Sequence, residues 1–297
     1  MSARMPVKPS TLFILALALA LGATSPAPLR ADDIFLPRPT VGQLLALLKA
    51  PGGPLDGYPW SAVGRFERPI SGGCTGVLVG RRVVLTAAHC LFNPTTHEWL
   101  PARGFVFTPG VGTPRRGERS AALDYRTAPG FNPYARAALA GEGVDLALVL
   151  LAEPLGDRAG FLPWLQSAEI ARAMARREGT LLEAGYAEAS AARLSVHGNC
   201  RVMQYFAKDH VFVHSCLSLS GESGSPLFLK EGGRYRLAGI EVGTADMRFP
   251  GREQVGAAVT LEALDRMLSD PKGLAPPSDL DVWGDPERRI PVGLAQR

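Results

Sequence analysis

Short apolar segments with turns between them restrict the fold of this chain more than any other sequence feature. Each segment has the length of a β-strand, and 33 glycines and 25 prolines supply residues for the turns. Many short strands at regular spacing predict an all-β sandwich or barrel, and about 200 β-rich residues also fit two packed barrels. The predicted strands cover residues 60–66, 74–79, 82–86, 105–107, 145–151, 181–186, 200–206, 211–216, 226–229, 237–242 and 256–260.

Helical periodicity is confined to a few short segments of the chain. Apolar residues recur at helical spacing in residues 41–50, 165–178 and 261–268, and the last of these predicts a closing helix. Residues 108–143 are rich in Pro, Gly and Arg and are predicted to be mostly loop. The tail at 270–297 contains repeated prolines and is predicted to be extended or mobile.

The N-terminus has the pattern of an export signal. Arg4 and Lys8 precede an apolar run that is shorter than the roughly 20 residues needed to span a bilayer. Small residues and prolines follow up to Ala31, so residues 1–31 are predicted to be a signal peptide and the protein to be secreted or periplasmic. An uncleaved membrane anchor is the alternative. Residues 32–57 fit either a pro-segment or an N-terminal extension packed on the body.

The charge of the chain excludes a nucleic-acid footprint. Its formal net charge is +4, and the predicted signal peptide removes only basic residues, which leaves a nearly neutral mature chain. Arginine pairs such as Arg115-Arg116 are isolated and form no basic stripe.

Four cysteines follow the predicted export signal: Cys74, Cys90, Cys200 and Cys216. An even number of cysteines in an exported chain indicates disulfides, and four cysteines allow three pairings. Pairing of nearest neighbours is the simplest, and each closed loop would stabilise the fold by about 3 kcal/mol. A zinc site is the alternative, but no pair has the C-x-x-C spacing, so no metal is expected.

The heptapeptide Ser220–Pro226 has a composition suited to acyl transfer. Glycines at 221 and 224 flank Glu222-Ser223 and allow a sharp turn that can expose the Ser223 hydroxyl. Backbone N–H groups of such a turn can converge to form an oxyanion hole. A Gly/Ser surface loop is the alternative interpretation of the same residues.

A nucleophilic serine needs a base, and the base needs an orienting group. Of the five histidines, His89 stands apart because it ends an apolar strand and adjoins Cys90; a core histidine is the alternative. Asp145 heads the apolar run 146–151, where a carboxylate is costly unless it has a partner. Asp124 is a weaker candidate in a mixed polar segment.

Three segments occur in the order His, Asp, Ser: residues 85–90 (LTAAHC), 145–148 (DLAL) and 221–226 (GESGSP). Together they resemble the signature segments of the chymotrypsin/trypsin-like serine peptidases. The Gly-x-Ser-Gly-Ser-Pro form and residues 58–65 (YPWSAVGR) are similar to the bacterial secreted branch, which includes the glutamyl endopeptidases.

The resemblance covers roughly residues 57–269, and a peptidase domain is expected at 58–269. It implies two six-stranded β-barrels with the active site in the cleft between them and a C-terminal helix. By the same resemblance, Ser223 is the nucleophile, His89 the general base and Asp145 the orienting acid. The N–H groups of Gly221 and Ser223 form the oxyanion hole. The implied disulfides are Cys74–Cys90 and Cys200–Cys216.

The sequence departs from the family pattern at the residue before the nucleophile. Glu222 stands where animal trypsins have the aspartate that pairs with a newly formed N-terminus. No Ile-Val-Gly-Gly sequence precedes Trp60, so activation by insertion of a new N-terminus is not expected.

The sequence departs from the pattern in the specificity pocket as well. Leu217 replaces the acid that selects Lys and Arg, and Glu241 replaces a histidine of the glutamyl endopeptidases. Glu241 either lines the pocket or faces solvent or an arginine, Arg236 or Arg252. The residues expected to line the pocket are Leu217, Ser218, Glu241, Val242 and Gly243.

Together these features predict a secreted serine endopeptidase that needs no metal or organic cofactor. Its expected partners are protein or peptide substrates, with no nucleic acid and no stable membrane anchor, and it is expected to be a monomer. Two alternatives use the same fold: a catalytically silent relative that binds proteins, and an esterase with the same triad.

Overall fold

The computed structural model of the chain describes residues 57–111, 118–134, 143–162, 168–169, 172–173, 180–231, 234–245, 247 and 255–269. The predicted signal peptide, the predicted helix at 41–50 and the tail at 270–297 lie outside these residues, as does nearly all of the segment 32–57. Within the described residues, no helix has both the length and the apolar character needed to cross a membrane.

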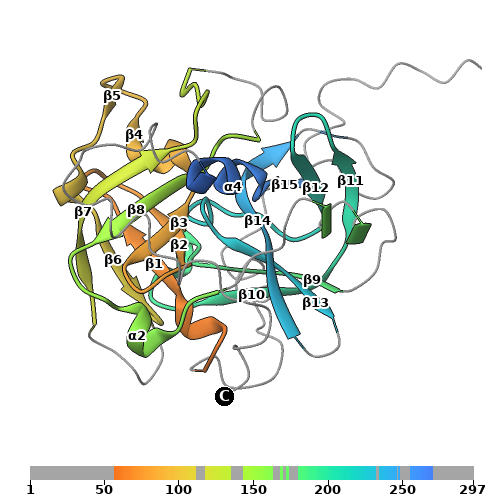
Figure 1. Cartoon of the computed structure of the whole chain (residues 1–297), viewed down its shortest axis with the longest axis horizontal. Helices are drawn as coiled ribbons and strands as arrows, with labels where there is room; N and C mark the ends of the chain where they lie inside the picture. Colours follow the sequence, from red (N-terminus) through yellow and green to blue (C-terminus); the bar gives the residue numbers. More distant parts are fainter. Residues whose placement is uncertain are drawn as a thin grey trace, which may run out of the picture. The chain divides into compact units, whose positions relative to one another are not determined.

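The first half of the described chain closes into a six-stranded antiparallel barrel (Figure 1). Around the barrel the strands follow the order β1-β2-β3-β8-β7-β6. Its interior is filled by large aromatic and aliphatic side chains, among them Phe66 and Phe105, whose rings stack 5.1 Å apart. The strands are β1 Val63–Glu67, β2 Gly73–Leu78, β3 Val83–Thr86, β6 Val106–Pro109, β7 Ser120–Thr127 and β8 Ala147–Leu151.

The second half forms a seven-stranded antiparallel sheet in the order β10-β9-β13-β14-β15-β12-β11. Its two edge strands are consecutive in the chain and are separated only by Arg201, so the sheet curls until the chain itself joins its edges. The strands are β9 Thr180–Gly185, β10 Ser195–Cys200, β11 Val202–Phe206, β12 Val211–His214, β13 Pro226–Glu231, β14 Arg234–Ala245 and β15 Val255–Thr260.

This arrangement confirms the chymotrypsin-like fold class, with one closed barrel and one curled sheet. The second unit counts seven strands because one long strand bends at Arg201 and pairs with a different neighbour on each side of the bend. The predicted C-terminal helix is α4 (Glu262–Ser269), which buries Ala263, Leu264 and Met267. A single-turn helix, α2 (Gly156–Ala159), follows β8.

Two predictions of local structure were wrong. Residues 60–62 form a 3₁₀ turn, η2, before β1 rather than part of a strand. Residues 120–127 form strand β7 inside the stretch predicted as loop. The sequence signal of β7 was weak because Asp124 and Arg126, which lie 3.2 Å apart as an ion pair, interrupt its apolar pattern.

Strand β10 and a hairpin of β4 (Phe92–Asn93) with β5 (Glu98–Trp99) were not predicted at all. The strand β10 escaped notice because it carries His197, Gly198 and Asn199 in place of an apolar run. Of the predicted helix at 165–178, the described residues 168–169 and 172–173 are helical.

Candidate active site

The sequence places His89 on a rigid turn at the end of a buried strand. Strand β3 ends at Thr86, and residues Ala88–Leu91 form the 3₁₀ turn η3. The predicted Cys74–Cys90 disulfide is present and ties this turn to strand β2. The side chain of His89 is 37% exposed, so its imidazole ring remains accessible while its backbone is held.

Asp145 holds His89 through two hydrogen bonds. The backbone N–H of His89 donates to Asp145 Oδ1 at 2.9 Å, and Nδ1 lies 2.8 Å from Oδ2. The carboxylate is almost fully buried, and a buried acid needs a hydrogen-bond partner. His89 is that partner. Asp124 lies on β7 and pairs with Arg126, so of the two candidate acids it is Asp145 that contacts His89.

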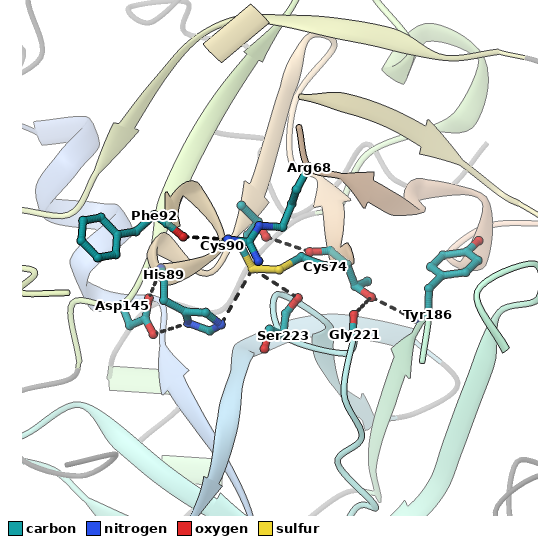
Figure 2. Close-up of a disulfide and its surroundings, with 11 residues drawn as sticks. Arg68, Cys74, His89, Cys90, Phe92, Asp145, Tyr186, Gly221 and Ser223 are labelled. Carbon is teal, nitrogen blue, oxygen red and sulfur yellow. Dashed lines mark hydrogen bonds and ion pairs between the residues drawn. A yellow bond between two sulfur atoms is a disulfide. The ribbon is translucent and has the colours of Figure 1, made fainter. Parts of the chain in front are cut away.

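The Cys74–Cys90 disulfide brings the His89 ring and the Ser223 backbone together (Figure 2). His89 Nε2 lies 3.9 Å from the Cys90 sulfur, and the Ser223 carbonyl oxygen lies 3.8 Å from the same atom. A disulfide sulfur carries no proton, so these are packing contacts. Figure 2 draws no hydrogen bond between the imidazole and the Ser223 hydroxyl.

Thr75, on strand β2 of the first barrel, fixes the serine loop (residues 219–224), which precedes β13 of the curled sheet. Its N–H donates to the Ser223 carbonyl at 2.8 Å, and its hydroxyl donates to the Gly221 carbonyl at 3.1 Å. The same hydroxyl accepts the Tyr186 N–H at 2.9 Å. These bonds keep the two halves of the site in register.

The loop also requires glycine immediately after the serine. Gly224 has φ +87°, and a Cβ built there would lie 2.0 Å from the Thr75 carbonyl oxygen. No L side chain fits this position without moving the backbone. The predicted tight, glycine-dependent turn around Ser223 is therefore present.

Hydrogen bonds around the loop also set the direction of the Gly221 N–H. The Ser220 carbonyl accepts the Glu188 N–H at 2.7 Å. In a trans peptide the C=O and the following N–H point in opposite directions, so the Gly221 N–H points away from Glu188.

The Ser223 N–H is oriented in the same manner. The preceding carbonyl, that of Glu222, accepts the Ser225 N–H at 2.8 Å and so turns the Ser223 N–H to the other side. Within the described part of the chain, neither the Gly221 nor the Ser223 N–H donates a hydrogen bond.

Three of the predicted pocket residues meet at the carboxylate of Glu241. Ser218 Oγ donates to Glu241 Oε1 at 2.7 Å, and the Gly243 N–H donates to the same oxygen at 3.1 Å. The other oxygen lies 2.6 Å from His214 Nε2. Glu241 is fully buried. Leu217 and Val242, which adjoin Ser218 and Glu241 in the chain, are half-buried.

Glu241 neither faces solvent nor pairs with Arg236, so these two alternatives were wrong. Arg236 instead donates to Glu169 at 3.2 Å, and Arg252 lies outside the described residues. The carboxylate faces inward, toward the fully buried His214 on β12, the second strand along the sheet from β14.

Further ionisable groups lie in the interior of the curled sheet. Glu222 is fully buried, and its Oε1 lies 3.0 Å from His197 Nε2. Glu183 is also fully buried, and neither of its carboxyl oxygens has a hydrogen-bond partner among the described residues. Burial raises the pKa of Glu183 well above its ordinary value, and the negative charges of Glu241 and Glu222 raise it further.

Among the residues that the structure describes, two groups of side chains have the spacing of metal ligands, Cys74–His89–Cys90 and Glu183–His214–Cys216. The sulfurs in both groups belong to disulfides, including the predicted Cys200–Cys216, which is also present. A disulfide sulfur is not a thiolate ligand, so one donor remains in the first group and two in the second.

Sequence reasoning missed several residues that hydrogen-bond to the candidate site: Thr75, Glu188, His197 and His214. Thr75 and Glu188 act through backbone and hydroxyl bonds that leave no mark in an apolar pattern. His214 could have been found, because a histidine directly after the buried run 211–213 needs a partner, as Asp145 does.

Comparison with known proteins identifies the family of the chain. Residues 74–240, more than half of the chain, match the family model described as the trypsin-like peptidase domain. The chain belongs to this family. A solved structure of a Glu endopeptidase in complex with MPD matches the trypsin-like peptidase described here with a TM-score of 0.58 and 14% sequence identity. The match covers 74% of this chain and 96% of that chain, and at this identity it is a likeness of fold.

Proposed function

We propose that this trypsin-like peptidase is a serine endopeptidase whose triad is His89, Asp145 and Ser223. The observation that carries the proposal is the pair of hydrogen bonds from His89 to the buried Asp145. They fix the tautomer with the proton on Nδ1, which leaves a basic lone pair on Nε2. Family membership supports the assignment, because the matched residues 74–240 include all three side chains.

The proposed mechanism proceeds through an acyl-enzyme. Ser223 Oγ attacks the substrate carbonyl and transfers its proton to His89 Nε2, and Asp145 stabilises the imidazolium. The N–H groups of Gly221 and Ser223 bind the oxyanion, and one such donor is worth about 3 kcal/mol of barrier. His89 then protonates the leaving amine, and a water molecule that it deprotonates hydrolyses the ester. No metal or organic cofactor enters these steps.

The proposed specificity pocket is lined by Leu217, Ser218, Glu241, Val242 and Gly243. We propose that acidic side chains are disfavoured before the scissile bond, because the Glu241 carboxylate lies directly behind the Ser218 hydroxyl. Large apolar or basic side chains are preferred, since the Leu217 side chain offers apolar surface and Gly243 has no side chain to close the pocket.

The proposed site of action is outside the cytoplasm. Two disulfides support this location, since thiols are kept reduced in the cytosol. The proposed organisation is a signal peptide at 1–31, an N-terminal segment at 32–57, the peptidase domain at 58–269 and a tail at 270–297. The proposed substrates are proteins or peptides, and the enzyme is proposed to be a monomer.

Covalent labelling tests the proposed function. A phosphonofluoridate is expected to label the purified protein at Ser223, as located by mass spectrometry of its peptides, and to stop peptide hydrolysis. The Ser223→Ala variant is expected to take up no label and to lose several orders of magnitude in kcat while keeping its melting temperature. Labelling at Ser220 or Ser225 would contradict the assignment, and no labelling would favour a catalytically silent relative. Hydrolysis of esters but not of peptides would favour an esterase.

A further inference from the structure

The residue before the proposed nucleophile is held by an internal partner. Glu222 is fully buried, and both of its carboxylate oxygens are engaged. Oε1 lies 3.0 Å from His197 Nε2, and Oε2 accepts the Leu219 N–H at 2.8 Å. The backbone N–H of Glu222 also donates to the Leu219 carbonyl at 3.0 Å, so Glu222 closes the loop 219–222 at both its side chain and its backbone.

This closed loop determines where the proposed oxyanion donors lie. The peptide groups before Gly221 and before Ser223 both belong to residues 219–223, and a tilt of either would turn its N–H away from the substrate. The Glu222 side chain is the part of the loop that reaches the interior of the curled sheet. Its anchor there therefore helps to set the position of both donors, together with the bonds from Thr75 and Glu188.

His197 is well placed to be that anchor. It lies on β10 opposite Glu183 of β9, and its side chain is 6% exposed. The Cys200–Cys216 disulfide ties the end of the same strand to the segment directly before the loop. Strand β10 thus holds the loop from both sides, through the disulfide before residue 217 and through the hydrogen bond at Glu222.

A buried pair of this kind contributes little to net stability, because removing both groups from water costs about as much as their attraction returns. The place of the pair suits it to hold the loop in one conformation instead. Both side chains are almost completely buried, and Glu222 directly precedes the proposed nucleophile Ser223. With both oxygens already engaged, the carboxylate does not require a chain α-amino group as a partner.

We propose that His197 is a positioning residue that keeps the loop 219–223 in its active form through Glu222, in place of a newly formed α-amino group. The proposal rests on the proposed function, since it concerns the same oxyanion hole. A peptidase built in this way is competent once its chain has folded, and its activity does not depend on which residue begins the mature chain.

Substitution of His197 provides the first test. His197→Ala is expected to lower kcat by about 10²–10³, the range for loss of an oxyanion donor, with a KM within a few-fold of wild type. His197→Gln keeps an N–H donor near the Nε2 position and is expected to stay within about tenfold of the wild-type kcat. The matched control is His210→Asn, which alters another histidine–glutamate pair, 2.6 Å from Glu262 and outside the loop, and should leave kcat unchanged.

Chemical blocking of the N-terminus provides a second test that needs no substitution. Near pH 6.5 an acylating reagent favours an α-amino group, whose pKa is about 8, over lysines near 10.4. The acetylated wild-type enzyme is expected to retain its kcat. Loss of activity on acetylation would overturn the proposal, and so would a wild-type kcat in His197→Ala. The acetylation test uses the wild-type protein, so it remains decisive even if His197→Ala does not fold. A wild type that neither hydrolyses peptides nor reacts at Ser223 would instead remove the proposed function, and the inference with it.

Discussion

Replacing Glu183 by glutamine is expected to change how the stability of this protein depends on pH. Glu183 is fully buried, and within the described residues its carboxyl oxygens have no hydrogen-bond partner. Burial, together with the charges of Glu241 and Glu222, raises its pKa well above the ordinary value of 4.5. The raised pKa favours the neutral acid at pH values where an exposed glutamate is ionised, and glutamine closely resembles that neutral acid in size and charge.

The sign follows from proton binding in the two states. Because the folded pKa is raised, the stabilisation due to this carboxyl is fully present below about pH 4.5 and is lost as the pH rises through the folded pKa. Within that window the wild type loses up to about 1.4 kcal/mol of unfolding free energy per pH unit, and glutamine loses none from this position. Glu183→Gln is therefore expected to be near neutral at low pH and increasingly stabilising, relative to wild type, as the pH rises.

Urea unfolding measures this difference directly. Both proteins are prepared in the Ser223→Ala background to prevent self-digestion, and their unfolding free energies are compared at about pH 5.5, 6.5 and 7.5. The control is Glu153→Gln, an exposed carboxyl in the first barrel, which should give curves parallel to wild type. Parallel curves for Glu183→Gln as well would refute the conclusion that burial raises the pKa of Glu183.

Further substitutions test the site itself. Asp145→Asn is expected to lower kcat by about 10⁴ through the wrong imidazole tautomer, whereas Asp124→Asn should be near neutral in the same peptidase assay; the reverse result would contradict the placement of Asp145. Gly224→Ala places a Cβ 2.0 Å from a carbonyl oxygen and should abolish activity and lower the melting temperature, whereas Gly72→Ala, with a similar positive φ and open space, should cost only about 1 kcal/mol. Glu241→Gln should relax discrimination against acidic residues in a peptide-library assay, and an unchanged profile would mean that its charge does not act on the substrate.

Much of the fold could be predicted because it follows from local patterns. The apolar run 146–151, with Asp145 directly before it, predicted both the strand that is β8 and a partner for Asp145. Cysteine counting and the family resemblance predicted the disulfides, and both are present. Strands β7 and β10 were missed because charged or polar residues occupy them, and those residues find their partners only after folding.

The sequence by itself determined the fold class and the types of residue at the site: a histidine beside a disulfide, an acid heading a buried strand, and a serine between glycines. Only the tertiary structure decided which donor meets which acceptor. The bonds from Thr75 to the serine loop and from His197 to Glu222 join residues distant in the chain, and no local pattern encodes them. They form because burial removes water, and each buried carboxylate or carbonyl must then find a donor from whichever strand the barrel places beside it.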